Sequence, residues 1–309
     1  MSDQAATLRA LRDQGVTALR PRRHRALAVS GGKGGIGKST LSLGLALAYA
    51  RGGARTLLVD TDLGMADLNL LLGVAPERSL LDAIHGASID EVLVSAHGVT
   101  LLPALNGSYV LANMAGPTRQ RTLELVDSLS DRFDTVVLDI AAGIAANQST
   151  FTAAASDRVV VVDPEPLSLA DAYACLKVLA VEYGVTTAYV VPNRVTSRAQ
   201  ADEIVGRLAA LVSRFLDLEL IPLPAVPHDP AVPEAAHAGV PLLAHRPDSP
   251  AARAIRQVAR ALDARASATS DDAPRRFWRN SFLVLPATSP RPRVLWVPIR
   301  ALAFWRTIA

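Results

Sequence analysis

One glycine-rich stretch organises the whole sequence: Ala28-Val-Ser-Gly-Gly-Lys-Gly-Gly-Ile-Gly-Lys-Ser-Thr-Leu41, which contains GxxxxGK[ST] from Gly32 to Ser39. The apolar run 26–30 before it predicts a strand, and the apolar pattern after it predicts a helix that ends near residue 51. A pattern of this kind between a strand and a helix is a P-loop. Its glycines allow backbone N–H groups to turn toward a phosphate, and the helix N-terminus adds its dipole.

The P-loop predicts a site for ATP and Mg²⁺, the two cofactors that we expect. Lys38 would neutralise the β and γ phosphates and act in catalysis, and the Ser39 hydroxyl would ligate Mg²⁺. The residues of the loop that are expected to bind ATP are Gly32, Lys33, Gly34, Gly35, Ile36, Gly37, Lys38, Ser39 and Thr40.

Apolar runs and helical patterns alternate along the rest of the chain. Expected strands lie at 26–30, 56–60, 99–102, 135–139, 158–162, 185–191 and 218–221, and expected helices include 117–130, 167–183 and 197–214. Several runs, such as Arg158-Val-Val-Val-Val-Asp163, are continuously apolar, which is typical of strands that are buried on both faces. The sequence therefore predicts an α/β fold, a doubly wound and mostly parallel sheet with helices on both sides.

The composition narrows the class of protein. Half of the 309 residues are apolar and a fifth are charged, which suits one large packed domain with appendages and argues against a disordered chain. No apolar run approaches about 18 residues, and the first residues lack the apolar centre of a secretory signal. The single cysteine, Cys175, excludes an intrachain disulfide framework and a CxxC metal site. We expect a soluble, cytoplasmic protein.

The last part of the chain has a different composition. Residues 273–309 hold seven arginines, no acid and all three tryptophans. Since the whole chain carries a net charge of +3 and these residues carry +7, residues 1–272 carry −4. We expect three parts: an N-terminal helix with a basic connector at 1–25, a P-loop domain at 26–265, and a linker with a basic, aromatic tail at 266–309.

The tail allows two interpretations. Its aromatic residues and arginines suit contact with an anionic membrane, which would place the protein peripherally on the inner face of the cell membrane. Its prolines, Pro286, Pro290, Pro292 and Pro298, prevent one long amphipathic helix. The second interpretation is therefore a tail that docks a protein partner or has no function of its own.

Lys33, which directly follows the first glycine of the pattern, gives the loop the form KGGxGK[ST]. This form resembles the deviant Walker A motif of the MinD/ParA ATPases, and the resemblance covers residues 26–262. It implies an ATPase that forms a homodimer around two nucleotides and hydrolyses ATP slowly. In that family the first lysine reaches the phosphates bound by the partner, so the resemblance assigns a catalytic role in trans to Lys33, like that of an arginine finger.

Two other stretches are similar to the switches of that family. The stretch Thr56-Leu-Leu-Val-Asp60-Thr-Asp62 resembles the first switch, which implies that Asp62 positions the attacking water and that Asp60 helps to hold the metal. The stretch Thr135-Val-Val-Leu-Asp139-Ile-Ala-Ala-Gly143 resembles Walker B with the second switch, which implies that Asp139 holds Mg²⁺ through a water. Ala141 departs from the Pro or Gly that the family has at this position. Asn193 matches a residue whose amide contacts adenine, although an asparagine after a strand is more often a turn residue.

Two features resemble the flagellar branch of the family, known as FlhG or FleN. Residues 3–9, Asp-Gln-Ala-Ala-Thr-Leu-Arg, match its DQAxxLR element, and Asp171-Ala-Tyr with Lys177 matches its DAYxxxK pattern. In that branch the N-terminal element stimulates the GTPase FlhF. The resemblance implies control of flagellar number and placement, and a transcriptional or basal-body partner is a further candidate. The residues that it assigns to partner binding are Asp3, Gln4, Leu8 and Arg9.

Two other functions stay open at this point. The first is a MinD/ParA-type ATPase of division-site placement or DNA segregation, although the charge of −4 on residues 1–272 does not favour DNA as a partner. The second is a nucleotide-dependent scaffold that does not hydrolyse ATP. Iron–sulfur members of the fold are excluded because Cys175 is alone, and tyrosine autokinases because no tyrosine follows Tyr189.

Overall fold

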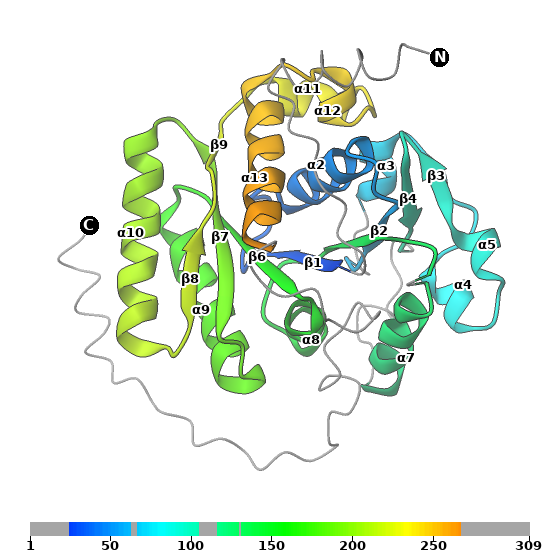
Figure 1. Ribbon diagram of the computed structural model, residues 1–309, viewed down its shortest axis with the longest axis horizontal. Coiled ribbons are helices and arrows are strands. Elements are labelled where there is room, and N and C mark those ends of the chain that lie inside the picture. The colour runs from blue at the N-terminus through cyan, green and yellow to red at the C-terminus, as the bar shows by residue number, and fades with distance from the viewer. Residues whose placement is uncertain (1–24, 63–66, 105–115, 130, 267–309) are drawn as a thin grey trace, which may run out of the picture.

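The computed structural model describes residues 25–62, 67–104, 116–129 and 131–266, and these residues build a nine-stranded sheet with helices on both faces (Figure 1). The strand order is β3-β4-β2-β5-β1-β6-β7-β8, and β9 pairs with β7. Neighbouring strands are parallel except for the antiparallel pair β3 and β4. The predicted α/β fold with a mostly parallel sheet is confirmed. The strands are β1 (Arg25–Ser30), β2 (Thr56–Asp60), β3 (Val94–Ala96), β4 (Val99–Leu102), β5 (Thr135–Asp139), β6 (Asp157–Val162), β7 (Thr187–Val195), β8 (Glu219–Pro222) and β9 (Val226–Pro227).

Two groups of helices cover the two faces of this sheet (Figure 1). One face carries α2 (Lys38–Arg51), α3 (Leu68–Leu72), α11 (Ala231–His237), α12 (Leu242–His245) and α13 (Pro250–Ala266). The other face carries α7 (Gly116–Asp127), α8 (Ala146–Ala154), α9 (Pro166–Tyr183) and α10 (Arg198–Phe215), with the short α4 (Leu80–Ile84) and α5 (Ile89–Val92) at its edge.

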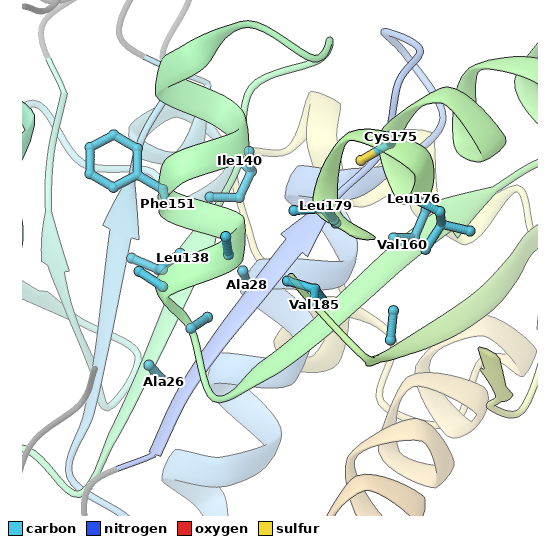
Figure 2. Packing of buried hydrophobic residues seen from close by; sticks show 14 of the residues in the cluster. Ala26, Ala28, Leu138, Ile140, Phe151, Val160, Cys175, Leu176, Leu179 and Val185 are labelled. Atoms are coloured by element: carbon cyan, nitrogen blue, oxygen red, sulfur yellow. The ribbon is translucent and has the colours of Figure 1, made fainter. Parts of the chain in front are cut away.

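The central strand β1 shows why both faces are apolar. Ala26 and Ala28 pack into the core on the α8 and α9 side, whereas Leu27 and Val29 pack into the core on the α2 side, and all four are fully buried. Successive side chains of a strand point to opposite faces, so a strand between two helical layers must be apolar at every position. Figure 2 shows the first of these cores, in which Phe151 of α8 and Leu176 and Leu179 of α9 cover the sheet.

The strand order fixes where a ligand can bind. β1 lies between β5 and β6. Its own connection runs through α2 to β2 on one side, whereas the connection of the neighbouring β5 runs through α8 to β6 on the other side. In open α/β sheets, ligands bind in the crevice outside the carboxyl ends of the strands at such a point. The predicted phosphate loop follows directly after Ser30, the last residue of β1.

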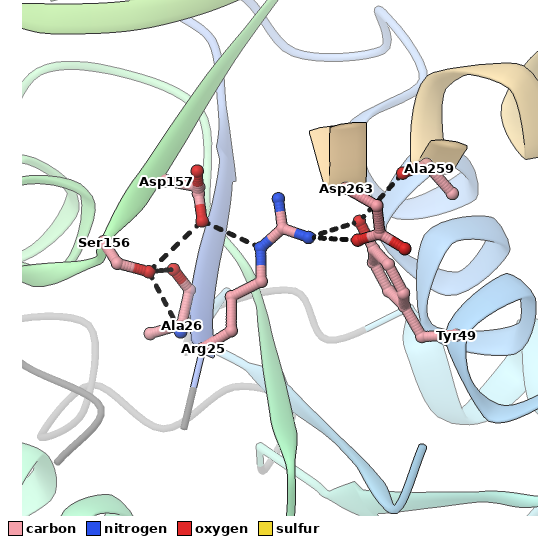
Figure 3. Close-up of polar contacts among 7 residues, drawn as sticks. All are labelled: Arg25, Ala26, Tyr49, Ser156, Asp157, Ala259 and Asp263. Atoms are coloured by element: carbon pink, nitrogen blue, oxygen red, sulfur yellow. Dashed lines mark hydrogen bonds and ion pairs between the residues drawn. The ribbon is translucent and has the colours of Figure 1, made fainter. Parts of the chain in front are cut away.

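A buried arginine, Arg25, begins β1 at the end of the strand that lies away from the phosphate loop (Figure 3). Arg25 is 2% exposed, and its Nε donates to Asp157 Oδ2 of β6 at 2.8 Å. Its Nη1 donates to Asp263 Oδ1 of α13 at 2.8 Å and to the Tyr49 hydroxyl of α2 at 2.9 Å. A buried cation is tolerated when its partners supply charge and hydrogen bonds together. This network therefore ties together one strand pair and two helices.

The main expected strands and helices are present, with small shifts at their ends. The strand expected at 185–191 is β7, which runs to Val195, and the helix expected at 117–130 ends at Asp127. The expectations for the N-terminal helix and for the tail fall on residues 1–24 and 267–309, outside the described residues. Among the helices that the structure describes, none is long and apolar enough to cross a membrane.

Candidate functional site

The predicted phosphate loop connects β1 to α2 with the backbone that such a loop requires. Gly35 and Gly37 have φ angles of 75° and 89°, in the left-handed region that disfavours side chains. A Cβ atom on Gly37 would lie 2.4 Å from Asn193 Nδ2, and one on Gly32 would lie 2.5 Å from the Asp171 carbonyl oxygen. The glycines therefore allow the loop to pass closely under β7 and against α9.

Lys38 begins α2, and its side chain folds back under the loop. Its Nζ donates to the Lys33 carbonyl oxygen at 3.0 Å, and the residue is 8% exposed. Burial lowers the pKa of Lys38, and the charges of Asp139 and Asp62 act in the opposite direction. A buried ammonium at the N-terminus of a helix is a suitable partner for phosphate, as predicted for this residue.

Asp60 and Asp139 end the neighbouring strands β2 and β5 at the same level of the sheet. They are 1% and 2% exposed. Burial raises the pKa of Asp139 to about 6, against hydrogen bonds from the hydroxyls of Ser39 and Ser42, the latter at 2.8 Å. Burial, followed by the charge of Asp139, also raises the pKa of Asp60 well above its usual range. Two carboxylates that disfavour each other's charge form an environment in which a bound cation is stabilising.

These residues fit Mg²⁺ in particular. Within the described parts of the chain, no three His, Cys, Asp or Glu side chains gather as a metal-binding group. Mg²⁺ does not need such a group, because it is held by one or two carboxylates together with water and substrate phosphates. The predicted metal residues Ser39, Asp60 and Asp139 are brought together, since the Ser39 hydroxyl donates to Asp139 and Asp139 is paired in register with Asp60.

Asp62 lies two residues beyond the end of β2, next to Asp60. Its backbone N–H donates to Asp60 Oδ1 at 2.9 Å, which fixes the turn after the strand. Its charge also acts on the pKa of Lys38, so its carboxylate lies near the ammonium of that residue. The role in positioning water stays a prediction, and its place beside Lys38 is compatible with it.

A cavity of about 310 Å³ opens on the other side of the loop, between Thr40 of α2, Asn193 of β7 and Asp229. Ligand pockets begin at roughly this size. Asn193 lines the cavity, but its Nδ2 donates to the Ile36 carbonyl oxygen at 2.7 Å. In this structure the amide therefore supports the loop, and the predicted contact with adenine stays a prediction.

Arg194 is a residue of this site that sequence reasoning missed. It has a φ angle of 59°, and it lies at a register shift between β7 and β9. Its Nη1 donates to the Gly35 carbonyl oxygen at 3.2 Å and lies 3.9 Å from Asp163 Oδ2. A bulky residue in the left-handed region is uncommon and often marks a functional position. No pattern in the sequence indicates this backbone conformation.

Lys33 lies on the rim of the loop rather than beneath it. Its Nζ forms an ion pair with Glu165 Oε2, and the two side chains are 27% and 58% exposed. Glu165 was not predicted as a site residue. A signal was present, because Glu165 follows soon after the continuously apolar strand β6 and so lies at the sheet edge that carries the loop.

Ser42 was also missed. It is a polar residue inside the apolar run of α2, and its hydroxyl donates both to the Lys38 carbonyl oxygen and to Asp139. Serine in an otherwise apolar helix face was the available signal. The residues predicted to bind a partner, Asp3, Gln4, Leu8 and Arg9, lie outside the described residues.

Comparison with known proteins adds a family, two relatives and a solved structure. The model of the CobQ/CobB/MinD/ParA nucleotide binding domain matches residues 27–242. The antiactivator FleN of Pseudomonas aeruginosa is 35% identical over 239 residues, which cover 77% of this chain and 85% of FleN. The flagellum site-determining protein YlxH of Helicobacter pylori is 32% identical over 154 residues, which cover 49% of this chain and 52% of YlxH. The structure of the septum site-determining protein MinD of Pyrococcus horikoshii, complexed with Mg-ADP, has the same fold, with a TM-score of 0.65 and 24% identity over 80% of this chain and 99% of that chain.

Proposed function

Because this chain belongs to the CobQ/CobB/MinD/ParA family of nucleotide-binding domains and is one of its Mg²⁺-dependent ATPases, we propose that it is an ATP-dependent dimerising switch that regulates flagellar number and placement. In this proposal, two copies assemble around two ATP molecules and separate after hydrolysis. The assembled and separated states then differ in the partners that they bind.

The observation that carries the nucleotide part is the arrangement of Lys38, Asp60 and Asp139 at the carboxyl end of the central strand. A buried ammonium lies at the start of α2, and two buried carboxyl residues are paired in register at the ends of β2 and β5. Ser39 and Asp139 would hold Mg²⁺, with Asp60 supporting them, and Lys38 would bind the phosphates. The metal would neutralise charge on the phosphates when it is bound.

Hydrolysis requires two more groups in this proposal. The charge of Asp62 acts on the phosphate-binding ammonium of Lys38, and in this proposal its carboxylate orients the attacking water. Lys33 lies on the rim, where its side chain is partly exposed and can be reached by a second copy. A cation supplied in trans is worth about 10³ or more in rate at comparable sites, so ATP hydrolysis should depend on dimerisation.

The flagellar part of the proposal rests on the relatives. FleN is an antiactivator and YlxH is a flagellum site-determining protein by name, and both exceed 30% identity to this chain over the matched residues. The DQAxxLR element at residues 3–9 adds an expected partner, a GTPase of the FlhF kind. We place the protein in the cytoplasm, with the tail at 273–309 as a candidate contact to anionic membrane.

Two measurements test this function. Phosphate release from Mg·ATP should be detectable, and Lys38→Ala should abolish ATP binding in calorimetry because the phosphates lose their buried cation. Binding that survives unchanged would overturn the nucleotide site, and a protein that binds ATP without releasing phosphate would be a scaffold. The control is Lys177→Ala on α9, which removes a lysine outside the loop.

The partner is tested separately. The full chain should bind FlhF in a pull-down and stimulate its GTPase, and a variant that lacks residues 1–12 should do neither. Gln4→Ala should lose the stimulation but keep the protein's own ATPase activity, since a glutamine can orient water for GTP hydrolysis. If deletion of residues 1–12 changes nothing and a division inhibitor binds instead, the protein acts in division-site placement.

A further inference from the structure

Two successive residues of β7 bond to two successive carbonyl groups of the phosphate loop. Asn193 Nδ2 donates to the Ile36 carbonyl oxygen at 2.7 Å, and Arg194 Nη1 donates to the Gly35 carbonyl oxygen at 3.2 Å. Successive side chains of a regular strand point to opposite faces of the sheet. The backbone of β7 must therefore depart from a regular strand where these two residues meet the loop.

The departure lies at Arg194. Asn193 is paired with Val226 of β9, and the next pair is formed by Val195 and Pro227, so β7 has two residues where β9 has one. An extra residue of this kind is a β-bulge, which changes the direction of a side chain and is common next to active sites. The φ angle of Arg194, 59°, lies in the left-handed region that glycine adopts with least strain. The strained position nevertheless carries an arginine, and the bulge directs its side chain to the loop.

The guanidinium of Arg194 also has an anchor in the sheet. Its Nη1 lies 3.9 Å from Oδ2 of Asp163, a residue that directly follows β6 and is 3% exposed. The other carboxylate oxygen of Asp163 accepts a backbone N–H at 3.2 Å, which fixes this carboxylate in place. Arg194 therefore connects the Gly35 carbonyl to a fixed point at the end of a central strand.

The two bonds from β7 determine the direction of the peptide groups in the loop. The peptide bonds are trans, and in a trans peptide the C=O and the following N–H point in opposite directions. Because the carbonyls of Gly35 and Ile36 are turned toward β7, the N–H groups of Ile36 and Gly37 are turned away from it. Backbone N–H groups of a P-loop are the donors that surround a phosphate.

We propose that Arg194 is a positioning residue for phosphate binding, because its bond to the Gly35 carbonyl holds the loop with the N–H groups of Ile36 and Gly37 directed at a bound phosphate. This inference rests on the nucleotide site of the function proposed above, and it assigns Arg194 no contact with the nucleotide itself. A loop that is already held in its binding form costs less to order when the ligand arrives, so affinity rises.

Arg194→Gly removes the guanidinium and at the same time relieves the left-handed backbone. The dissociation constants for Mg·ADP and for Mg·pyrophosphate, measured by calorimetry, should both rise about three- to tenfold, which is the contribution of one hydrogen bond. Arg194 lines the cavity beside the loop, so a contact with the ribose or the base is the competing explanation. Pyrophosphate has neither group, and a rise for ADP alone would overturn the proposal. Unchanged dissociation constants for both ligands would overturn it as well.

The matched control is His97→Gly. Among the residues that the structure describes, His97 is the other non-glycine residue with a left-handed backbone, with a φ angle of 52°. It lies between β3 and β4, at the opposite edge of the sheet. The same relief of strain at His97 should leave both dissociation constants unchanged. An equal rise in this control would show that the added glycine, and not the lost contact with the loop, weakens binding.

A second readout needs no ligand. NMR order parameters measure the ps–ns motion of backbone N–H groups. In the nucleotide-free protein, Arg194→Gly should lower the order parameters of Ile36 and Gly37, whereas His97→Gly should not. If they do not change although both dissociation constants rise, the guanidinium acts on the bound phosphates directly and the proposal is wrong. A wild-type protein that binds neither ADP nor pyrophosphate would instead refute the nucleotide site, and the order parameters would still decide whether Arg194 holds the loop.

Discussion

Asp60 and Asp139 lie opposite each other at the ends of β2 and β5, and both are almost completely buried. Burial and the charge of Asp139 raise the pKa of Asp60, and burial raises the pKa of Asp139 to about 6 against hydrogen bonds from Ser39 and Ser42 and the charge of Lys38. In the nucleotide-free protein the fold therefore disfavours a negative charge on both carboxyl groups. Binding sites of this kind lower stability in the free state, and a bound cation restores it.

The first prediction concerns the stability of this pair. Asp60→Asn removes one of the two charges, and its amide oxygen can still accept the backbone hydrogen bond from Asp62. We expect the free energy of unfolding of the nucleotide-free protein to rise by about 1 kcal/mol, because repulsion between buried charges is removed. The additional stabilisation that Mg·ATP gives the wild type should shrink. Urea unfolding with and without Mg·ATP measures both.

The control for that prediction is Asp217→Asn, which makes the same change at an exposed carboxylate before β8. It should change neither the free energy of unfolding of the nucleotide-free protein nor the additional stabilisation by Mg·ATP. If Asp60→Asn destabilises the nucleotide-free protein, or if Mg·ATP stabilises it as much as it stabilises the wild type, then Asp60 is not part of a cation site.

The second prediction separates nucleotide binding from assembly. Lys33→Ala should keep ATP binding by the single chain, since Lys38 provides the buried cation, but it should lose the ATP-dependent dimer. Asp62→Ala should do the reverse and accumulate a dimer that hydrolyses ATP at least about tenfold more slowly, because the water is no longer oriented. Light scattering with ATP and a phosphate-release assay distinguish the two variants. A Lys33→Ala protein that dimerises like the wild type would show that Lys33 does not act on the second copy.

Local patterns were enough to predict the edge of the sheet that carries this site. Continuous apolar runs indicated buried parallel strands, the GxxxxGK[ST] pattern gave Lys38, and Asp60 and Asp139 stand at the ends of two of the apolar runs. The contacts made by Glu165 and Arg194 could not be predicted in this way. They depend on β6 and β7 lying beside β1, and they join residues 132 and 159 positions apart.

Two other elements were missed. β9 has two residues, which is too short for an alternating pattern to emerge. The helix α13 was not predicted although its sequence carries a signal, because its buried residues recur at helical spacing between exposed polar ones. Its apolar face packs into the same core as α2.

The third prediction uses the single thiol. Burial raises the pKa of Cys175 to about 11, against a hydrogen bond with Ser30 and the charge of Lys38. At pH 8 only about 0.1% of the native thiol is then thiolate, so iodoacetamide should modify it at least about 100-fold more slowly than in urea. Because the pKa of Cys175 is higher in the folded protein than in the unfolded chain, burial of the protonated thiol contributes to the free energy of unfolding. This contribution is complete below about pH 8.5 and is lost as the pH rises toward 11. Mass spectrometry after timed quenching checks the rate, and equal rates in native and unfolded protein would show an accessible thiol.

The fourth prediction concerns Arg25, which joins β1 to Asp157, Asp263 and Tyr49 at the end of the sheet away from the loop (Figure 3). Arg25→Met should lower the free energy of unfolding by about 3–5 kcal/mol, because it leaves two nearly buried carboxylates without their cation. Arg55→Met is the matched control. Arg55 also binds a carboxylate, that of Asp134, but its side chain is 56% exposed, and water can replace the partner that is lost. Urea unfolding should therefore separate the two variants clearly. If both lose the same amount of stability, the Arg25 network is no more important to the fold than a surface ion pair.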